Sequence, residues 1–485
     1  MTSIKFGTDG WRAIIGEEFN LENVERVVQA YADVTSPPSG VRSVYIGHDR
    51  RRLSRDAAER AAKVLAANGF TVYLSKDYCP TPCISVMVKL HHAMGGIGGR
   101  EDSLPRLKPS SGFAGDGEST GVVITASHNP AAWNGVKFKE SYGGSASPEF
   151  TAKIEKRLAA GVSVKKTGGA EILSFDPHDA YVKALRERID TTAIAKSNWK
   201  IAYDPLFGAG AGFLEKVLER PVHEIHGEAN PSFGGLNPEP IDKNLGELMA
   251  LVPREKFDVG LATDGDADRI GAVDETGRFV TPHQIYALIL NHLIERGERG
   301  DVVKTVSTTS MIDRIAAKHG LKVHETPIGF KHICGKFLET TPLIGGEESG
   351  GIGIPSHVYE RDGLLCGLML LEIMSVKKER LGELLKHLER EIGPFHFVRE
   401  DVHLSEDERK KVVDRLAAQP VSSLAGAKVK EVNRLDGTKY LLEDGSWLLL
   451  RPSGTEPLVR IYAEASSPES ARRLAAEGRR ILNLA

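Results

Sequence analysis

The sequence predicts an α/β fold: three related α/β/α domains with mixed sheets, followed by a C-terminal α+β domain, all arranged around a central cleft. A strand–loop–helix–strand pattern that occurs three times along the chain supports the α/β part. Short strand-like runs beside separate helical segments near the carboxyl end support the α+β part. The length of 485 residues agrees with both, because domains usually contain ~100–200 residues.

The first copy of the repeated pattern lies near the amino end. Residues 43–47 are apolar enough for a buried strand, residues 56–68 carry alanines at helical spacing, and Gly69 is a stop signal before a strand at 70–74. The same order is expected twice more, at 199–203, 210–218 and 222–225, and then at 301–307, 310–319 and 322–325.

The carboxyl end has a different pattern. Short strands are expected at 398–404, 427–435, 439–443 and 446–451, and helices at 405–418 and 468–482. Gly393 and Pro394 end a charged helix and mark the start of this last domain. The predicted domains therefore cover residues 1–168, 169–277, 278–392 and 393–485.

Composition excludes several classes of protein. Hydrophobic residues make up 41% and charged residues 27%, which is ordinary globular usage and argues against a disordered chain. The net charge of −3 and the lack of a basic stripe argue against a nucleic-acid partner. The amino end lacks the apolar core of a signal peptide, and no apolar run reaches the ~18–20 residues that span a bilayer. Residues 363–374 are the longest candidate and are expected to form a buried helix.

Cysteine usage favours a cytoplasmic protein without a membrane partner. Four cysteines in a chain of this length cannot form a disulfide scaffold, so reduced thiols are expected. Cys79 and Cys83 enclose a Cys-Pro-Thr-Pro-Cys turn, but this spacing is not that of a zinc-binding Cys-x-x-Cys.

Residues 95–119 are rich in Gly, Ser and Pro without periodicity, which predicts a long surface loop.

Ser127 lies in Thr125-Ala-Ser-His-Asn-Pro130, directly after an apolar strand. A serine on a tight turn after a buried strand is well placed to be an exposed nucleophile. The Gly-x-Ser-x-Gly elbow is missing, which argues against an α/β-hydrolase. The alternative is an ordinary Asn-Pro turn with a capping serine.

Asp264, Asp266 and Asp268 alternate in a loop that follows the predicted strand 258–263. Three carboxylates at this spacing can converge on one hard cation through their oxygens. An EF-hand would also place Glu275 at its last ligand position, but Arg269 stands where that loop needs glycine, and the flanking segment is a strand. A solvated acidic loop is the remaining alternative, although three close charges of one sign repel without a cation.

Two further loops contain groups that suit a sugar phosphate. In Gly345-Gly-Glu-Glu-Ser-Gly-Gly351, Glu347 and Ser349 share one face of an extended turn and could bind vicinal hydroxyls. In Arg451-Pro-Ser-Gly-Thr-Glu-Pro457, the arginine fork, the hydroxyls and the amides around the glycine form a candidate phosphate clamp. A plain glycine turn and a capped turn are the respective alternatives.

These loops together resemble the α-D-phosphohexomutase superfamily. The resemblance runs through Phe6-Gly-Thr-Asp-Gly-Trp-Arg12 and the four loops above, in the order and at the spacing of that family, over nearly the whole chain. It implies four domains around a cleft, and a phosphoryl group carried by Ser127. One Mg²⁺ would be bound by an oxygen on Ser127 and by Asp264, Asp266 and Asp268.

The resemblance also assigns the substrate groups. Sugar hydroxyls would be bound by Glu347 and Ser349, with Lys331 of the Gly329-Phe-Lys-His332 loop helping to choose the sugar. The phosphate that does not react would be held by Arg451, Ser453, Gly454 and Thr455. The groups placed near the transferring phosphate would be Arg12, His128, Lys137 and Arg269. Lys137 is the first candidate for the general base, with His128 or Arg12 as the alternatives, and a lysine base requires a depressed pKa.

The implied reaction moves a phosphoryl group between C1 and C6 of a hexose phosphate, through phosphoserine and a bisphosphate such as glucose 1,6-bisphosphate. The fourth domain would close over the phosphate clamp and exclude water. Glucose and mannose phosphates are the expected substrates. Phosphoglucosamine mutase is the alternative, although that branch more often has glutamine where this chain has Glu348. A metal-dependent sugar phosphatase and a non-catalytic sugar-phosphate sensor are alternatives from other classes.

Two features depart from the family pattern. Residues 95–119 are an insertion, expected on the outer surface, with the mouth of the cleft as the alternative. Gly351 stands where some members have a histidine after Glu-x-Ser-Gly. The role of that histidine therefore cannot be transferred to this chain. Sequence does not decide between a monomer and a homodimer.

Overall fold

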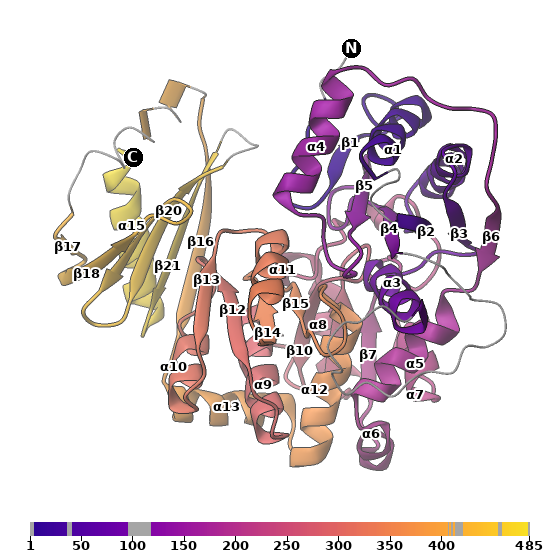
Figure 1. Ribbon diagram of the computed structural model, residues 1–485. Helices are drawn as coiled ribbons and strands as arrows, with labels where there is room; N and C mark the ends of the chain where they lie inside the picture. The colour runs from indigo at the N-terminus through magenta and orange to yellow at the C-terminus, as the bar shows by residue number, and fades with distance from the viewer. Residues whose placement is uncertain are drawn as a thin grey trace.

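The computed structural model describes residues 4–35, 41–95, 118–405, 407–408, 411–412, 421–453 and 458–483. Within these ranges the chain forms four sheets in sequence order, with helices packed beside them (Figure 1). The predicted surface loop at 95–119 falls almost entirely outside the described residues. So do Gly454, Thr455 and most of the helix expected at 405–418.

The first sheet has the strand order β1-β5-β4-β2-β3-β6, in which β2, β3, β4 and β6 are parallel and β1 and β5 form an antiparallel edge. Its strands are β1 (Trp11–Ile14), β2 (Val41–His48), β3 (Thr71–Ser75), β4 (Glu118–Ile124), β5 (Trp133–Lys139) and β6 (Ile172–Phe175). Its helices are α1 (Leu21–Thr35), α2 (Ser54–Ala67), α3 (Thr81–Gly95) and α4 (Pro148–Ala159). Because β6 pairs with β3, this sheet extends past the limit of 168 predicted for the first domain.

The second and third sheets are also mixed. The second has the order β11-β10-β9-β7-β8, with β7 (Ile201–Asp204), β8 (His223–Glu224), β9 (Val259–Thr263), β10 (Ile270–Asp274) and β11 (Phe279–Val280). The third has the order β13-β12-β14-β15, with β12 (Asp301–Thr305), β13 (Val323–Thr326), β14 (Pro342–Gly346) and β15 (Ile352–Gly353). Their helices are α5 (His178–Arg188), α6 (Thr191–Ser197), α7 (Phe213–Leu218), α8 (Gly246–Arg254), α9 (Pro282–Glu295), α10 (Met311–Lys318), α11 (Phe330–Glu339), α12 (Gly363–Lys377) and α13 (Leu381–Ile392).

The fourth sheet is antiparallel, in the order β16-β21-β20-β19-β18-β17, and carries helix α15 (Pro468–Ile481). Its strands are β16 (His396–His403), β17 (Ser423–Leu424), β18 (Ala427–Asn433), β19 (Thr438–Leu442), β20 (Trp447–Pro452) and β21 (Leu458–Ala465). Strand β21 was not predicted, although it lies between β16 and β20 and is largely buried. The predicted α/β class with mixed sheets and an α+β end is confirmed.

The first three domains share one continuous apolar core. Tyr45 of the first sheet, Leu261 of the second and Leu365 of the third-domain helix α12 belong to the same buried cluster. Helix α12 is apolar on all sides, and it packs against both α6 and α9. The helix expected at 363–374 is therefore confirmed and joins two domains. No helix among the described residues is long and apolar enough to cross a membrane.

The fourth domain has a core of its own. Leu448, Leu450 and Ile461 belong to a cluster that is separate from the shared one. A small second cluster joins Val306, which follows β12, to Trp447 of β20. Figure 1 shows the yellow fourth sheet beside the third domain and apart from the indigo amino-terminal domain. The described cysteines are all buried and free, as expected for thiols.

Candidate active site

Ser127 follows β4 on the loop to β5 and has a φ of 52°, a left-handed conformation that is uncommon outside glycine. Its amide donates to Thr125 Oγ1 over 2.8 Å, and its Oγ donates to Asp264 Oδ2 over 2.8 Å. The expectation of an exposed nucleophile is wrong, because the side chain is fully buried here. The loop of the second domain covers it, with Gly265 packed directly against the Ser127 carbonyl.

Arg51, which the sequence reading missed, holds the serine loop in place. Its guanidinium pairs with Asp49 at 3.1 Å and donates to the carbonyls of Ser127 and Asn129, each over 2.6 Å. It also donates to the Pro130 carbonyl over 2.9 Å. Arg51 lies between the predicted strand 43–47 and the predicted helix 56–68, in a segment that carries no motif. These contacts show that it fixes the backbone of the predicted nucleophile.

Asp264, Asp266 and Asp268 lie between the antiparallel strands β9 and β10, and ligand oxygens of all three lie within 4.8 Å of one another. All three are fully buried. Burial, and the charges of the other two aspartates, raise the pKa of Asp264 well above its ordinary value. Such a cluster needs cations, which agrees with the predicted metal site rather than with a solvated acidic loop.

The free oxygens of this cluster fit a metal ion. Asp264 Oδ1 accepts hydrogen bonds from the amides of Asp268 and Arg269 over 2.9 and 3.0 Å. The Oδ1 atoms of Asp266 and Asp268 are buried without a hydrogen-bond partner. Carboxylate oxygens are the ligands that Mg²⁺ prefers. Glu275, the last ligand of the rejected EF-hand, instead accepts from the Gly382 amide over 3.0 Å.

Lys137 on β5 is buried among three carboxylates, at 2.7 Å from Asp9, 2.8 Å from Asp266 and 2.9 Å from Asp268. Burial alone would lower the pKa of Lys137, but these charges outweigh it and raise the pKa. These ion pairs favour the protonated lysine, whereas a lysine base requires a depressed pKa.

The other predicted groups around Ser127 lie close to it. His128 Nδ1 is 3.3 Å from Ser127 Oγ, and burial together with nearby cations lowers the pKa of this imidazole well below its ordinary value. Arg12 donates to Asn129 Oδ1 over 2.6 Å. The guanidinium of Arg269 lies 4.0 Å from Asp264 and 3.5 Å from Glu239. The first and second domains thus bring together the predicted groups for phosphoryl transfer.

The sugar-binding candidates come from the third domain. Glu347 follows β14 and is buried, with Oε1 accepting from the Gly329 amide over 3.1 Å. Burial raises the pKa of Glu347 to about 6. Ser349 is half-buried. Lys331, also half-buried, donates to the Gly7 carbonyl of the first domain over 3.3 Å.

The predicted phosphate clamp joins this group indirectly. Arg451 at the end of β20 pairs with Asp436 at 2.9 Å, and Asp436 also accepts from the Ile328 amide of the third domain over 2.9 Å. Ser453 is buried beside it, and its amide donates to the Leu458 carbonyl over 2.8 Å. A carboxylate thus connects the clamp arginine to Ile328, which lies just before helix α11, and Lys331 lies in the first turn of that helix.

Comparison with known proteins identifies the family of this four-domain chain. Family models for phosphoglucomutase/phosphomannomutase match the α/β/α domain I at 3–98 and 114–165, domain II at 179–277, domain III at 281–391 and the C-terminal domain at 405–481. The chain belongs to this family. The predicted membership of the phosphohexomutase superfamily is confirmed, and the chain is an isomerase of the phosphohexomutase class.

Individual relatives cover the chain almost completely. A phosphoglucomutase/phosphomannomutase from Thermococcus kodakarensis is 31% identical over 473 residues, 96% of each chain. A phosphoglucosamine/phosphogalactosamine mutase from Sulfurisphaera tokodaii is 27% identical over 496 residues, 98% of each chain. A solved structure from Thermus thermophilus, assigned as a phosphomannomutase, is 36% identical with a TM-score of 0.83 over 99% of each chain.

Several residues of this phosphohexomutase site were missed by the sequence reading. Asp9 belongs to the quoted motif around Arg12, but only the arginine was selected. Thr81 lies inside the Cys-Pro-Thr-Pro-Cys turn, which had been considered only for zinc; its Oγ1 donates to Asp266 Oδ2 over 2.5 Å. Arg361 precedes helix α12 and had no motif to mark it. Each becomes visible only through a contact between domains.

Proposed function

We propose that this phosphohexomutase interconverts the 1- and 6-phosphates of glucose, mannose or both, through phosphoserine 127 and a hexose 1,6-bisphosphate. One observation carries the proposal: Ser127 Oγ lies 2.8 Å from Asp264 in a buried trio of aspartates with two unpartnered oxygens. A hydroxyl beside such a group suits a phosphoryl acceptor, because phosphoryl transfer depends mainly on positioning and on neutralising charge.

Asp264, Asp266 and Asp268 would hold one Mg²⁺ together with an oxygen on Ser127. When bound, the ion supplies positive charge to the oxygens of the transferring phosphoryl group. Lys137 and Thr81 bind the Oδ2 atom of Asp266, so its Oδ1 atom stays available for the ion.

The proton of the attacking sugar hydroxyl needs an acceptor. Lys137 fits this role poorly, because its three N–H donors already face three carboxylates. His128 suits the return step, in which Ser127 Oγ is the attacking hydroxyl, because its Nδ1 atom lies 3.3 Å from that oxygen. Arg12 and Arg269 would bind the oxygens of the transferring phosphoryl group.

The two ends of the substrate would be held by different domains. Glu347 and Ser349 would bind sugar hydroxyls, with Lys331 beside them. Arg451 and Ser453 would bind the phosphate that does not react, and Gly454 and Thr455 stay predictions for the same group. After the first transfer the bisphosphate turns end for end. Each of its phosphates therefore occupies first one end of the site and then the other.

Phosphoglucosamine mutase is the second candidate, since a relative that covers the whole chain bears the name phosphoglucosamine/phosphogalactosamine mutase. Glu348, whose presence in the sequence favours glucose and mannose phosphates, does not decide between them and glucosamine phosphate. Glu348 Oε2 accepts from Ser307 Oγ over 2.6 Å and so is bound to a hydroxyl of its own domain.

The test is a panel of substrates. Protein is incubated with Mg²⁺, a trace of glucose 1,6-bisphosphate and the 1-phosphate of glucose, mannose or glucosamine, and the 6-phosphate formed is measured. We expect turnover of glucose or mannose 1-phosphate, lost on metal chelation and restored by Mg²⁺. Faster turnover of glucosamine 1-phosphate would favour the second candidate. Net release of inorganic phosphate would indicate a phosphatase, and binding without conversion would indicate a sensor; either overturns the proposal.

A further inference from the structure

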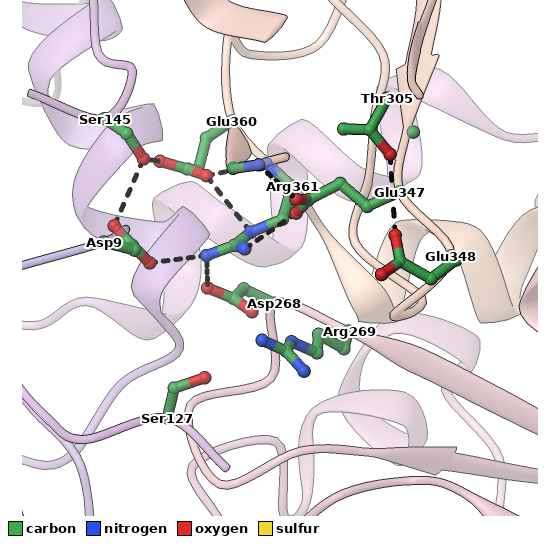
Figure 2. Close-up of polar contacts among 12 residues, drawn as sticks. Asp9, Ser127, Ser145, Asp268, Arg269, Thr305, Glu347, Glu348, Glu360 and Arg361 are labelled. Carbon is green, nitrogen blue, oxygen red and sulfur yellow. Dashed lines mark hydrogen bonds and ion pairs between the residues drawn. The ribbon is translucent and has the colours of Figure 1, made fainter. Parts of the chain in front are cut away.

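Arg361 is a buried guanidinium at the junction of three domains (Figure 2). One terminal nitrogen, NH2, lies 2.5 Å from Asp9 of the first domain and 2.7 Å from Asp268 of the second. The other, NH1, lies 3.2 Å from Glu347 of the third. The side chain thus joins a predicted metal ligand to the predicted sugar ligand.

Space for this arginine comes from Gly351. A Cβ atom added there would lie 2.3 Å from Arg361 Cδ and 3.2 Å from Glu347 Oε2. Contacts under 3.0 Å between such atoms are not tolerated, so any side chain at 351 must displace the arginine. The backbone supports the same arrangement. Gly351 forms an isolated antiparallel β-bridge with Arg269 of the metal loop, and Gly353 forms another with Arg361. Gly351, unexplained as a departure in sequence, is the residue over which Arg361 passes.

We propose that Arg361 is a positioning residue of the mutase site, and that Gly351 is required because it leaves room for it. Arg361 binds one oxygen of Asp268 and leaves the other, Oδ1, unpartnered. It also fixes Glu347, whose second oxygen is held by the Gly329 amide. Arg361 thereby fixes the proposed sugar ligand relative to the groups proposed for phosphoryl transfer. In this role Arg361 acts through Asp268 and Glu347, and the role rests on the proposed function.

The contacts to carboxylates of three domains require the planar, forked guanidinium group of an arginine. An arginine can direct separate nitrogens at carboxylates on different loops, whereas a lysine offers one point charge on a flexible stem. Arg361→Lys should keep positive charge between Asp9 and Asp268 but lose the bond to Glu347. Sugar binding should then suffer while metal binding is retained.

Four variants test the proposal: Arg361→Lys, Gly351→Ala, Arg361→Ala and the double variant Gly351→Ala/Arg361→Ala. KM and kcat come from the mutase assay, and affinities for Mg²⁺ and for the hexose phosphate come from calorimetry. Gly335→Ala is the matched control, since a Cβ at Gly335 meets nothing within 4 Å. Melting temperature is recorded for every variant.

Arg361→Lys and Gly351→Ala should each raise KM about tenfold, the usual effect of losing one charge-assisted hydrogen bond, while kcat and Mg²⁺ affinity change by less than about threefold. In the Arg361→Ala background, Gly351→Ala should have no further effect on KM or hexose-phosphate affinity, because the side chain it displaces is gone. A merely structural role would lower the melting temperature without this split or this non-additivity.

The inference is overturned if Arg361→Lys and Gly351→Ala both leave KM and hexose-phosphate affinity within twofold of the parent. It is also overturned if Gly351→Ala has the same effect with and without Arg361. Should Arg361→Ala not fold, the first two variants decide alone. Failure of the proposed function looks different: the parent protein itself would show no mutase turnover, while the calorimetric affinities would still report on Arg361.

Discussion

The end of the site that contains Ser127 and the end that contains Arg451 are built in different ways. Around Ser127, three domains share one apolar core, and buried cations face each aspartate of the metal loop. Around Arg451, the fourth domain has its own core and meets the third domain through a small cluster and a few polar contacts. The groups proposed for phosphoryl transfer lie in the joined part, and those proposed to hold the other phosphate lie in the fourth domain.

The difference also appears in the charged groups. Lys137 and Arg361 are almost fully buried with carboxylates from other domains, an arrangement that costs desolvation free energy and rarely stabilises a fold by itself. Lys439 of the fourth domain pairs with Glu325 of the third at 2.6 Å, but that glutamate side chain is 23% exposed. We infer that the buried network is kept for the geometry of the reacting end. The pair between Lys439 and Glu325, in contrast, holds the fourth domain against the third.

The largest effect should come from Ser127→Ala. Turnover should fall by roughly 10⁴-fold or more, as expected when a covalent nucleophile is removed. Calorimetry should still detect hexose phosphate at near-parent affinity, because Arg451 is unchanged. Intact-protein mass spectrometry should show a phosphorylated fraction of the parent and none of the variant. Ser174→Ala, an exposed serine on β6, is the control, and near-normal turnover of Ser127→Ala would disprove the phosphoserine mechanism.

Arg451→Met should affect the phosphate-binding end of the site without changing the end that contains Ser127. KM should rise by roughly 10²-fold, because a charge-assisted bond to phosphate is lost, whereas Mg²⁺ affinity should stay unchanged. Arg472→Met, an exposed arginine on α15, should have no effect. A fall in Mg²⁺ affinity would show that the ends are coupled more tightly than their separate cores indicate.

Glu347 should give a pH-dependent KM. Its pKa of about 6, raised by burial, means that the carboxylate becomes protonated as pH falls below 6 and loses acceptor capacity for sugar hydroxyls. Between pH 7 and pH 5 its ionised fraction, and hence its contribution to binding, should fall by about tenfold. The substrate phosphate titrates in the same range, so Glu347→Gln is the control. An identical profile in that variant would exclude Glu347 as the cause.

The smallest effect on catalysis should come from the junction. Lys439→Met removes the contact to Glu325 and should lower stability by about 1–3 kcal/mol, with kcat nearly unchanged. Differential scanning calorimetry should place this loss in the transition of the fourth domain. Lys430→Met, at an exposed position of β18, is the control. A matching loss across the whole protein would mean that the fourth domain unfolds together with the other three.

Local signals predicted most of the fold. The repeat that begins with β2 and α2 was visible because apolar runs, helical alanine spacing and Gly69 all act within a few residues. Strand β21 was missed, although it is central to its sheet, because it is buried on both faces and so lacks the alternation of a half-buried strand. The membership of β6 in the first sheet depends on pairing with β3, a contact of long sequence separation.

The sequence by itself determined which chemical groups this protein has: a serine on a turn, three alternating aspartates, and the loops for a sugar and a phosphate. Motifs of adjacent residues encode these, since each loop must present several groups at once. Tertiary structure alone decided that Ser127 is buried, that Lys137 lies among three carboxylates, and that Arg361 passes over Gly351 to reach Glu347. Those properties depend on burial and on charges brought from other domains, which no spacing along the chain reveals.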